Sequence, residues 1–260
     1  MTAEIHSPNR VGIISKPQKI NMANDWFEIA TADNFWMKRR FDVARRMLGV
    51  AGLNGRMIVE VGCGHGLLQR QVEDWYQVPV DGIDLNLQAL QRNVSRRGRL
   101  YFYNIFEQKP EFRGMYDLVI LFDVLEHIED QDSFLEALKF LMKPNGTLVI
   151  SVPALRQLFS EYDLCAGHVR RYSLRALEEV LKSHRFTIKR STYWGLCFTP
   201  LLWIRKYVLR FVKKTDVIRT GCTAPNRFLD NAFYWMSRLE PLPQRLFGTS
   251  AMALATLSMY

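Results

Sequence analysis

Short apolar segments alternate with longer segments of helical periodicity along the first part of the chain, and this alternation restricts the fold more than any other feature. The following segments read as strands: Met57–Val61, Pro79–Ile83, Leu100–Tyr103, Tyr116–Phe122 and Thr147–Val152. Strands that alternate with helices are typical of βαβ units, in which a helix connects two parallel strands. We therefore predict an α/β fold with a doubly wound, Rossmann-like and mostly parallel sheet.

The flanking segments predict additions to this sheet. Helical spacing of aromatic and aliphatic residues from Trp26 to Leu48 predicts one or two N-terminal helices. Phe186–Tyr193 and Ser250–Leu257 read as later strands, with a helical insertion between them. The chain then divides into a poorly ordered lead-in (1–23), a core with an N-terminal helical lid (24–194), a basic amphipathic insertion (195–248) and the last strand of the core sheet (249–260).

Composition and charge narrow the classes of function. The 260 residues are 48% hydrophobic and contain no apolar run long enough to span a bilayer, so we expect a cytoplasmic protein with a sizeable core. The formal net charge of +9 equals the number of basic residues between Val180 and Thr215, a stretch without acids. Basic charge concentrated in one zone predicts an anionic partner at one face of the molecule.

Glycines follow the first predicted strand, where a ligand would approach the backbone. Gly62, Gly64 and Gly66 lie between this strand and a helical pattern that begins at Leu67. Glycine permits close approach of the backbone, and a helix N-terminus offers unpaired N–H groups to an anion. A dinucleotide-binding GxGxxG motif would require glycine at Leu67, so the spacing disfavours an NAD-dependent oxidoreductase.

Asp84 ends the second predicted strand, about twenty residues after the glycine turn, where an acid can accept both hydroxyls of a ribose. This spacing predicts a nucleoside site. The alternative is that Asp84 only caps the helix that begins near Leu87.

Several motifs, in the right order from about Met57 to Tyr193, resemble those of class I S-adenosylmethionine-dependent methyltransferases. Residues 60–66 (EVGCGHG) resemble the first cofactor motif, and residues 116–128 (YDLVILFDVLEHI) resemble the fourth strand and loop of quinone-biosynthesis O-methyltransferases. Residues 141–147 (LMKPNGT) resemble the turn before the fifth strand. The resemblance implies S-adenosyl-L-methionine as cofactor, bound by Glu60, Gly62, Cys63, Gly64, Gly66, Asp84, Leu85, Asn104, Ile105, Phe122 and Asp123.

Two departures from this resemblance matter. Asn104 stands where many relatives place an acid for the adenine amino group, and it can offer only its amide. No Asn-Pro-Pro-Tyr-like segment follows Phe122, so we do not expect methylation of nucleobase amines, and nucleic acid is not an expected partner.

Two histidines are candidates for catalysis. Methyl transfer from a sulfonium is a direct displacement, so a base is needed only where the nucleophile must lose a proton. His127 follows the fourth strand and suits a general base or a residue that orients the substrate. The alternative is that His127 only packs at the edge of the site. His168 lies in a cluster, residues 168–172, of a kind that faces the substrate in similar methyltransferases.

Arg171, Tyr172 and Trp36 are candidates to bind the methyl acceptor. Arg171 and Tyr172 can anchor an acidic or hydroxylated molecule, or else belong to a surface loop tied to local acids such as Asp163. Trp36 and the neighbouring aromatic residues Trp26, Phe27 and Phe35 form either a lid over the cofactor or part of the core. The scattered histidines lack a carboxylate at ligand spacing, so we predict no metal site.

The insertion contains an amphipathic segment, residues 199–214, that begins at Thr199 and Pro200. At helical spacing its basic residues gather on one side and its apolar residues on the other. Such a helix can lie on an anionic membrane surface, which would make this cytoplasmic protein peripheral at the membrane. The alternative is a helix that covers the sheet or a dimer partner.

Taken with the resemblance, these features predict methyl transfer to a small or lipid-linked acceptor at oxygen, with nitrogen or carbon as alternatives. An RNA methyltransferase and a non-catalytic protein that binds S-adenosylmethionine remain rival interpretations. The sequence leaves the oligomeric state open.

Overall fold

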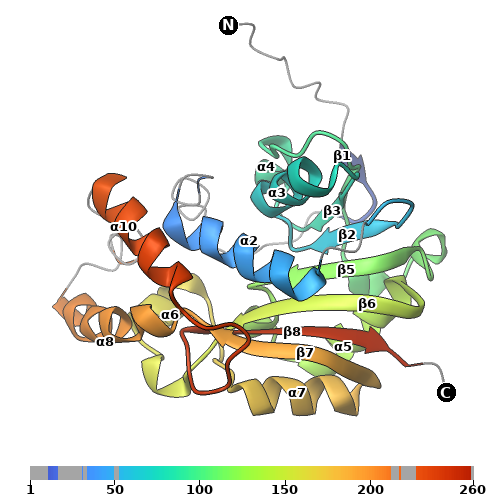
Figure 1. Cartoon of the computed structure of the whole chain (residues 1–260). Helices are drawn as coiled ribbons and strands as arrows, with labels where there is room; N and C mark the ends of the chain where they lie inside the picture. Colours follow the sequence, from blue (N-terminus) through green and yellow to red (C-terminus); the bar gives the residue numbers. More distant parts are fainter. Residues whose placement is uncertain are drawn as a thin grey trace, which may run out of the picture.

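The computed structural model describes residues 11–16, 31, 34–49, 53–211, 217 and 227–258, and within them a single twisted sheet forms the centre of the molecule (Figure 1). The strand order is β1-β4-β3-β2-β5-β6-β8-β7. The pairs from β1 to β6 are parallel, whereas β8 is antiparallel to both of its neighbours. The predicted α/β fold with a mostly parallel sheet is therefore confirmed. The strands are β1 Val11–Ile13, β2 Ile58–Val61, β3 Asp81–Asp84, β4 Leu100–Phe102, β5 Tyr116–Phe122, β6 Met142–Pro153, β7 Phe186–Trp194 and β8 Ser250–Leu257.

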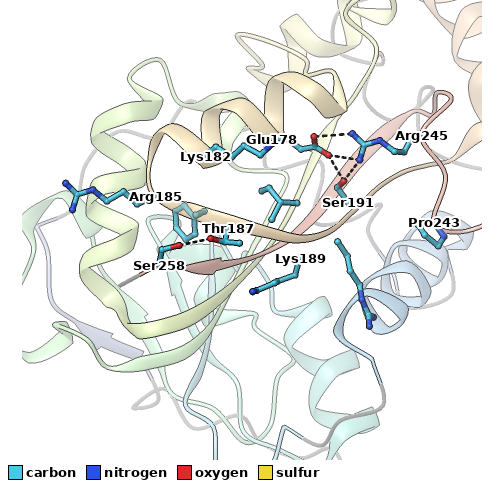
Figure 2. A pocket seen from close by; sticks show the side chains of 12 residues that line it. Glu178, Lys182, Arg185, Thr187, Lys189, Ser191, Pro243, Arg245 and Ser258 are labelled. Atoms are coloured by element: carbon cyan, nitrogen blue, oxygen red, sulfur yellow. Dashed lines mark hydrogen bonds and ion pairs between the residues drawn. The ribbon is translucent and has the colours of Figure 1, made fainter. Parts of the chain in front are cut away.

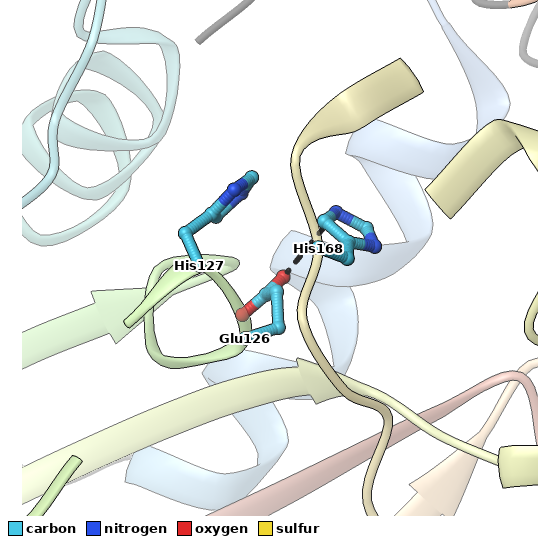
Figure 3. Close-up of side chains that lie close together, drawn as sticks. All are labelled: Glu126, His127 and His168. Atoms are coloured by element: carbon cyan, nitrogen blue, oxygen red, sulfur yellow. Dashed lines mark ion pairs between the residues drawn. The ribbon is translucent and has the colours of Figure 1, made fainter. Parts of the chain in front are cut away.

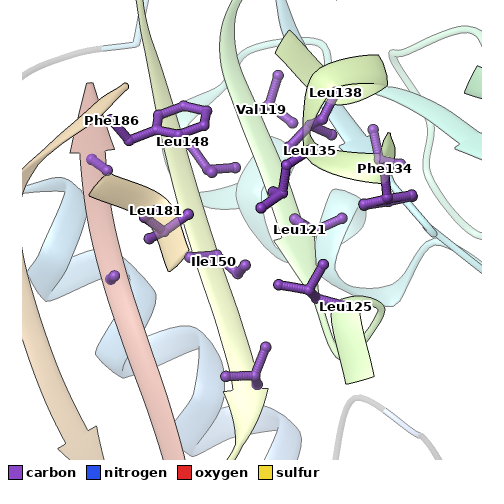
Figure 4. Packing of buried hydrophobic residues seen from close by; sticks show 14 of the residues in the cluster. Val119, Leu121, Leu125, Phe134, Leu135, Leu138, Leu148, Ile150, Leu181 and Phe186 are labelled. Atoms are coloured by element: carbon purple, nitrogen blue, oxygen red, sulfur yellow. The ribbon is translucent and has the colours of Figure 1, made fainter. Parts of the chain in front are cut away.

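Helices cover both faces of the sheet, because the strands of its centre are apolar on both sides. In β5, Leu118 and Ile120 pack with α2 and α3, while Val119 and Leu121 pack with α5 and α7. Figure 4 shows the second of these layers, in which Leu135, Leu138 and Leu181 meet the sheet. The helices are α2 Phe35–Leu48, α3 Leu67–Tyr76, α4 Leu87–Gln91, α5 Gln131–Leu141, α6 Glu161–Ala166, α7 Leu174–Ser183, α8 Thr199–Val208 and α10 Arg227–Arg238.

Short 3₁₀ turns connect several of these elements: η2 Ile105–Glu107, η3 Pro110–Phe112, η4 Leu125–His127, η5 Arg156–Leu158, η6 Leu196–Phe198 and η7 Leu209–Phe211. The turn η4 directly follows β5, and η5 follows β6, so both lie at the carboxyl ends of the strands. None of the helices in the described residues is long and apolar enough to cross a membrane.

Strand β1 was not predicted, and the assignment of residues 1–23 to a poorly ordered lead-in is wrong for Val11–Ile13. These residues pair in parallel with β4, and Gly12 lies against the ring of Tyr101. A strand of three residues with a central glycine has too little apolar alternation to be recognised. Strand β6 also begins earlier than Thr147, because α5 leads directly into Met142, whose partner in β5 is Tyr116.

Candidate functional site

The glycine turn after β2 has a backbone that only glycine adopts easily. Gly62 has a φ of 76°, and a Cβ there would lie 2.3 Å from Val124 Cγ2. Gly66 has a φ of 77°, and its Cβ would meet the side chain of Asn93 at the same distance. Both positions therefore require glycine, because their backbone is left-handed and because neighbouring side chains leave no space for a Cβ. The turn leads into α3, so the predicted glycine site lies at a helix N-terminus.

Asp84 ties the end of β3 to the glycine turn. Its Oδ2 accepts a hydrogen bond from the backbone N of Gly64 at 2.7 Å, and its Oδ1 accepts one from Asn86 N at 2.7 Å. Burial raises the pKa of Asp84. The helix α4 is capped by Asn86, whose side chain accepts from Ala89 N at 3.0 Å. The alternative that Asp84 only caps this helix is thus wrong.

Glu60 lies fully inside the protein at the end of β2. Its Oε2 accepts a hydrogen bond from Gln69 N at 3.1 Å, in the first turn of α3. Burial raises its pKa to about 8, although the positive charge of Arg40 opposes this shift. Near neutral pH the carboxyl group therefore carries a proton for much of the time.

Arg40 is a site residue that the sequence reasoning missed. It projects from α2, and its Nη1 lies 2.6 Å from Asp123 Oδ2. Its guanidinium carbon also lies 5.6 Å from the centre of the Phe122 ring. The Arg40 Nε is buried and makes no hydrogen bond within the described residues. The sequence offered only an arginine in the predicted helix before the glycine motif, and its burial became evident in the structure.

The other predicted cofactor residues have distinct surroundings. Asn104 caps η2, because its Oδ1 accepts from Phe106 N at 3.2 Å. Cys63 is buried within 3.9 Å of Asn93 Nδ2, and Ile105 belongs to the hydrophobic core. Leu85 is partly buried directly after Asp84. The contacts of these four residues with a cofactor stay predictions.

Glu126, His127 and His168 come together beside this edge of the sheet (Figure 3). Glu126 and His127 lie in η4, after β5, whereas His168 lies on the segment after α6. The centres of the two imidazole rings are 4.8 Å apart. One oxygen or nitrogen from each of the three side chains lies within 4.8 Å of the others. Ligand atoms at this spacing could also bind a metal ion.

Asp163 orients His168. Its Oδ1 lies 2.9 Å from His168 Nδ1 and 2.7 Å from Arg171 Nε. Burial alone would raise the pKa of Asp163, but the hydrogen bonds from His168 and Arg171 outweigh it and lower the pKa to about 2. An ionised Asp163 places the proton of neutral His168 on Nδ1, so that Nε2 is the nitrogen able to accept another proton.

Burial shifts the pKa of both His127 and Glu126 in the direction that favours the uncharged side chain. Burial and the neighbouring His168 lower the pKa of His127 to about 4, and its Nδ1 lies 3.2 Å from Gly167 O. Burial raises the pKa of Glu126 well above its ordinary value. Neither carboxyl oxygen of Glu126 has a hydrogen-bond partner in the described part of the chain, and Oε1 lies 4.0 Å from His168 Nε2. The cluster thus contains a buried polar group that a ligand can satisfy.

The three predicted substrate residues are held by contacts within the protein. Arg171 Nη1 donates to Ala154 O at 2.9 Å, in addition to its bond with Asp163. The hydroxyl of Tyr172 donates to Gln131 Oε1 at 3.0 Å, and burial raises its pKa to about 12. Both residues are buried, unlike the surface loop of the alternative prediction.

Trp36 belongs to an aromatic cluster, in which its ring centre lies 4.5 Å from that of Trp194 and 6.0 Å from that of Phe198. Phe35 joins the same cluster. Trp36 therefore packs against the core, as one of the two alternatives predicted. A contact between Trp36 and the methyl acceptor stays a prediction. Trp26 and Phe27 lie outside the described residues.

A methyltransferase domain family matches residues 35–190, which is more than half of the chain. The chain belongs to this methyltransferase family. The cofactor of the family is S-adenosyl-L-methionine, as the sequence motifs predicted. The match covers α2, the strands β2 to β6 and most of β7, and so includes every residue of the site described above.

Among curated proteins, this methyltransferase is similar to ubiquinone biosynthesis O-methyltransferases. The Cupriavidus pinatubonensis protein is 30% identical over 109 residues, which cover 40% of this chain and 43% of that protein. A Shewanella relative is 28% identical over 179 residues, covering 60% of this chain and 73% of the relative. The chain thus spans less than half the length of the Cupriavidus pinatubonensis protein and of the similar Escherichia coli enzyme.

Solved structures share the fold of this methyltransferase. A putative methyltransferase from Bacillus halodurans has a TM-score of 0.56 at 15% identity, and the match covers 84% of this chain and 99% of that one. Phosphoethanolamine N-methyltransferase 2 of Haemonchus contortus, in complex with S-adenosyl-L-methionine, has a TM-score of 0.55 at 20% identity, over 86% of this chain and 53% of that one.

A groove of about 750 Å³ lies elsewhere, along β7 and α7 (Figure 2). Its lining includes the basic residues Lys182, Arg185, Lys189, Arg190 and Arg245. Strand β7 is an edge of the sheet and is irregular between Ile188 and Arg190. Basic side chains and a bulge on an edge strand hinder pairing with other chains. This role accounts for the basic residues of β7 within the stretch between Val180 and Thr215.

Proposed function

We propose that this methyltransferase transfers the methyl group of S-adenosyl-L-methionine to a hydroxyl oxygen of a small or lipid-linked acceptor. The observation that carries the proposal is the pair of His168 and Asp163 beside His127 and Glu126, whose carboxyl oxygens accept no hydrogen bond from the described residues. The similarity to ubiquinone biosynthesis O-methyltransferases favours oxygen over nitrogen or carbon as the methyl acceptor.

The cofactor would bind along the carboxyl ends of β2, β3 and β5. The backbone of the glycine turn allows close approach, and Asp84 has the position and acceptor atoms to bind the ribose hydroxyls. Arg40 supplies the positive charge for the carboxylate of the methionine moiety, because its Nε is buried and has no hydrogen-bond partner among the described residues. Asp123 holds the guanidinium in place.

Methyl transfer requires little covalent chemistry from the protein. Bound S-adenosylmethionine would supply an electrophilic methyl group, which the acceptor oxygen would take up as the bond from the methyl carbon to sulfur breaks. The hydroxyl proton passes to Nε2 of His168, and Asp163 stabilises the imidazolium that results. His127 and Glu126 border the acceptor and exclude water from it.

Calorimetric titration with S-adenosylmethionine, S-adenosylhomocysteine and NAD tests the cofactor part of this proposal. We expect micromolar binding of the two sulfur nucleosides, no binding of NAD, and loss of binding in Asp84→Ala with the fold retained in circular dichroism. A methyl-transfer assay against a panel of phenols, catechols, amines and RNA tests the acceptor. Transfer to amines or RNA, and none to a hydroxyl, would contradict the assignment of oxygen.

A further inference from the structure

The helix α8 presents its apolar residues to solvent. Ile204 is 59% exposed and Phe211, in the adjoining η7, is 91% exposed, while Leu201 and Val208 are also exposed. A helix that packs on the body of a protein normally turns its apolar side inward. The prediction that α8 covers the sheet is not supported, because these residues lack cover in the described part of the chain.

The charged residues of α8 instead attach it to the protein. The guanidinium of Arg205 lies 4.1 Å from the centre of the Tyr162 ring in α6, and Lys206 Nζ donates to the backbone oxygen of Gln157 in η5. Charged groups, together with the buried Leu209 of η7 in its cluster with Tyr162, thus fix one side of the helix, while several apolar side chains are exposed on the other. An exposed apolar patch of this kind is typical of a surface that contacts a partner or a membrane.

The helix α10 also exposes large apolar side chains, although Phe233 on its inner side packs on Phe35 and Phe198. Its inner side is anchored by Asp230, which accepts from Phe35 N at 3.0 Å, and by Tyr234, whose hydroxyl donates to Asp42 at 2.8 Å. On its outer side Phe228 and Trp235 are exposed. Figure 1 shows α8 and α10 at the same end of the molecule, and α8 contacts η5 directly after β6. Both helices therefore lie toward the end of the sheet that carries the candidate site.

From these observations we infer that the exposed sides of α8, η7 and α10 form a docking surface for an anionic lipid bilayer. The inference rests on the proposed function, in that a bilayer would supply a lipid-linked acceptor. Residues 199–215 contain no acid, and they include Lys213 and Lys214, which follow η7 in the sequence. Trp203 and Trp235, with cationic groups 5.5 Å from each ring, match the amphipathic side chains found at membrane interfaces.

The surface lies close to the residues of the reaction. Tyr162, on which Arg205 of α8 packs, directly precedes Asp163, the partner of His168. A molecule anchored in the bilayer could therefore reach the site without leaving the lipid.

Flotation with phosphatidylcholine vesicles, with and without phosphatidylglycerol, tests the inference. We expect the full chain to float with the anionic vesicles and its binding to fall with added salt. Ile204→Glu and Phe211→Glu should each reduce the bound fraction at least about tenfold, because a carboxylate would enter the apolar layer. Ile13→Glu is the matched control, since Ile13 is 57% exposed on the distant strand β1, and it should bind as the wild type does.

Failure of the wild type to float, or equal flotation of Ile204→Glu, would overturn the inference. A dimer in light scattering that Ile204→Glu dissociates would assign the surface to a second copy instead. Calorimetry with S-adenosylmethionine on the same variants separates this inference from the proposed function: retained cofactor binding without flotation contradicts only the membrane surface, and flotation without cofactor binding contradicts only the proposed function.

Discussion

Arg40 Nη1 lies 2.6 Å from Asp123 Oδ2, and this ion pair joins α2 to the end of β5 across the candidate cofactor site. Asp123 has a left-handed backbone, with φ of 55°, and its N–H donates to Ser151 O at 2.9 Å. The ion pair thus fixes the positions of the Asp123 carboxylate and the Arg40 guanidinium relative to one another. The N-terminal helix thereby contributes a charge to a site that is otherwise built from the loops of the sheet.

Replacing Arg40 should weaken cofactor binding more than it weakens the fold. We expect the Kd for S-adenosylmethionine to rise about ten- to a hundredfold in Arg40→Gln, because a charge-assisted hydrogen bond to the carboxylate is lost. Calorimetry provides the measurement. Arg46→Gln, an exposed change on the same helix, is the control and should bind normally. An unchanged Kd in Arg40→Gln would remove Arg40 from the cofactor site.

His168→Gln should lose methyl transfer while it keeps the cofactor. We expect kcat to fall about a hundredfold or more with little change in cofactor Kd, because a general base contributes on this scale. Steady-state kinetics with a saturating concentration of S-adenosylmethionine provides the measurement. A variant that keeps the wild-type kcat would identify another base.

Removing Asp163 should destabilise the protein, because it leaves the buried Arg171 without its counter-charge. We expect Asp163→Ala to lose about 3 kcal/mol in the free energy of unfolding, measured with urea. The double variant Asp163→Ala/Arg171→Met should recover part of the loss. Since the pKa of Asp163 is lowered to about 2, its contribution to stability is present above its unfolded pKa of about 4 and is lost as the pH falls toward 2.

Glu60 should make stability depend on pH in the opposite direction. Its pKa rises to about 8 in the folded state, so the folded protein binds a proton that the unfolded chain has released. Stability without cofactor should therefore fall as the pH rises from about 4 to 8. In Glu60→Gln this dependence should be reduced, and the difference in Tm between variant and wild type should grow toward alkaline pH. A constant difference in Tm from pH 5 to 9 would contradict the shift.

The prediction that no metal is needed can be tested at the cluster of Glu126, His127 and His168, whose atoms lie at metal-ligand spacing. We expect turnover to be unchanged after treatment with a chelator and after addition of Mg²⁺, Mn²⁺ or Zn²⁺, because the proposed role of His168 is that of a base rather than a ligand. A rate that falls with chelator and recovers with one cation would show a metal site instead.

The sequence by itself determined the features that depend on neighbours along the chain. The alternating periods predicted the order and type of the strands, and β5 and β8 have the predicted bounds. The three glycines and Asp84 were recognisable because a turn with left-handed backbone needs glycine within a few residues of the strand end. Strand β1 was not predicted, because three residues are too few to show the alternation of apolar and polar residues that indicates a strand.

Only the tertiary structure decided which distant residues meet. Arg40 and Asp123 are 83 residues apart, and His127 and His168 meet because η4 and the segment after α6 pack together. The sequence showed that α8 is amphipathic, but only packing revealed that its apolar side faces outward. The physical reason is that periodicity reports which residues share a face of one element, whereas the partner of that face is selected by the free energy of packing the whole chain.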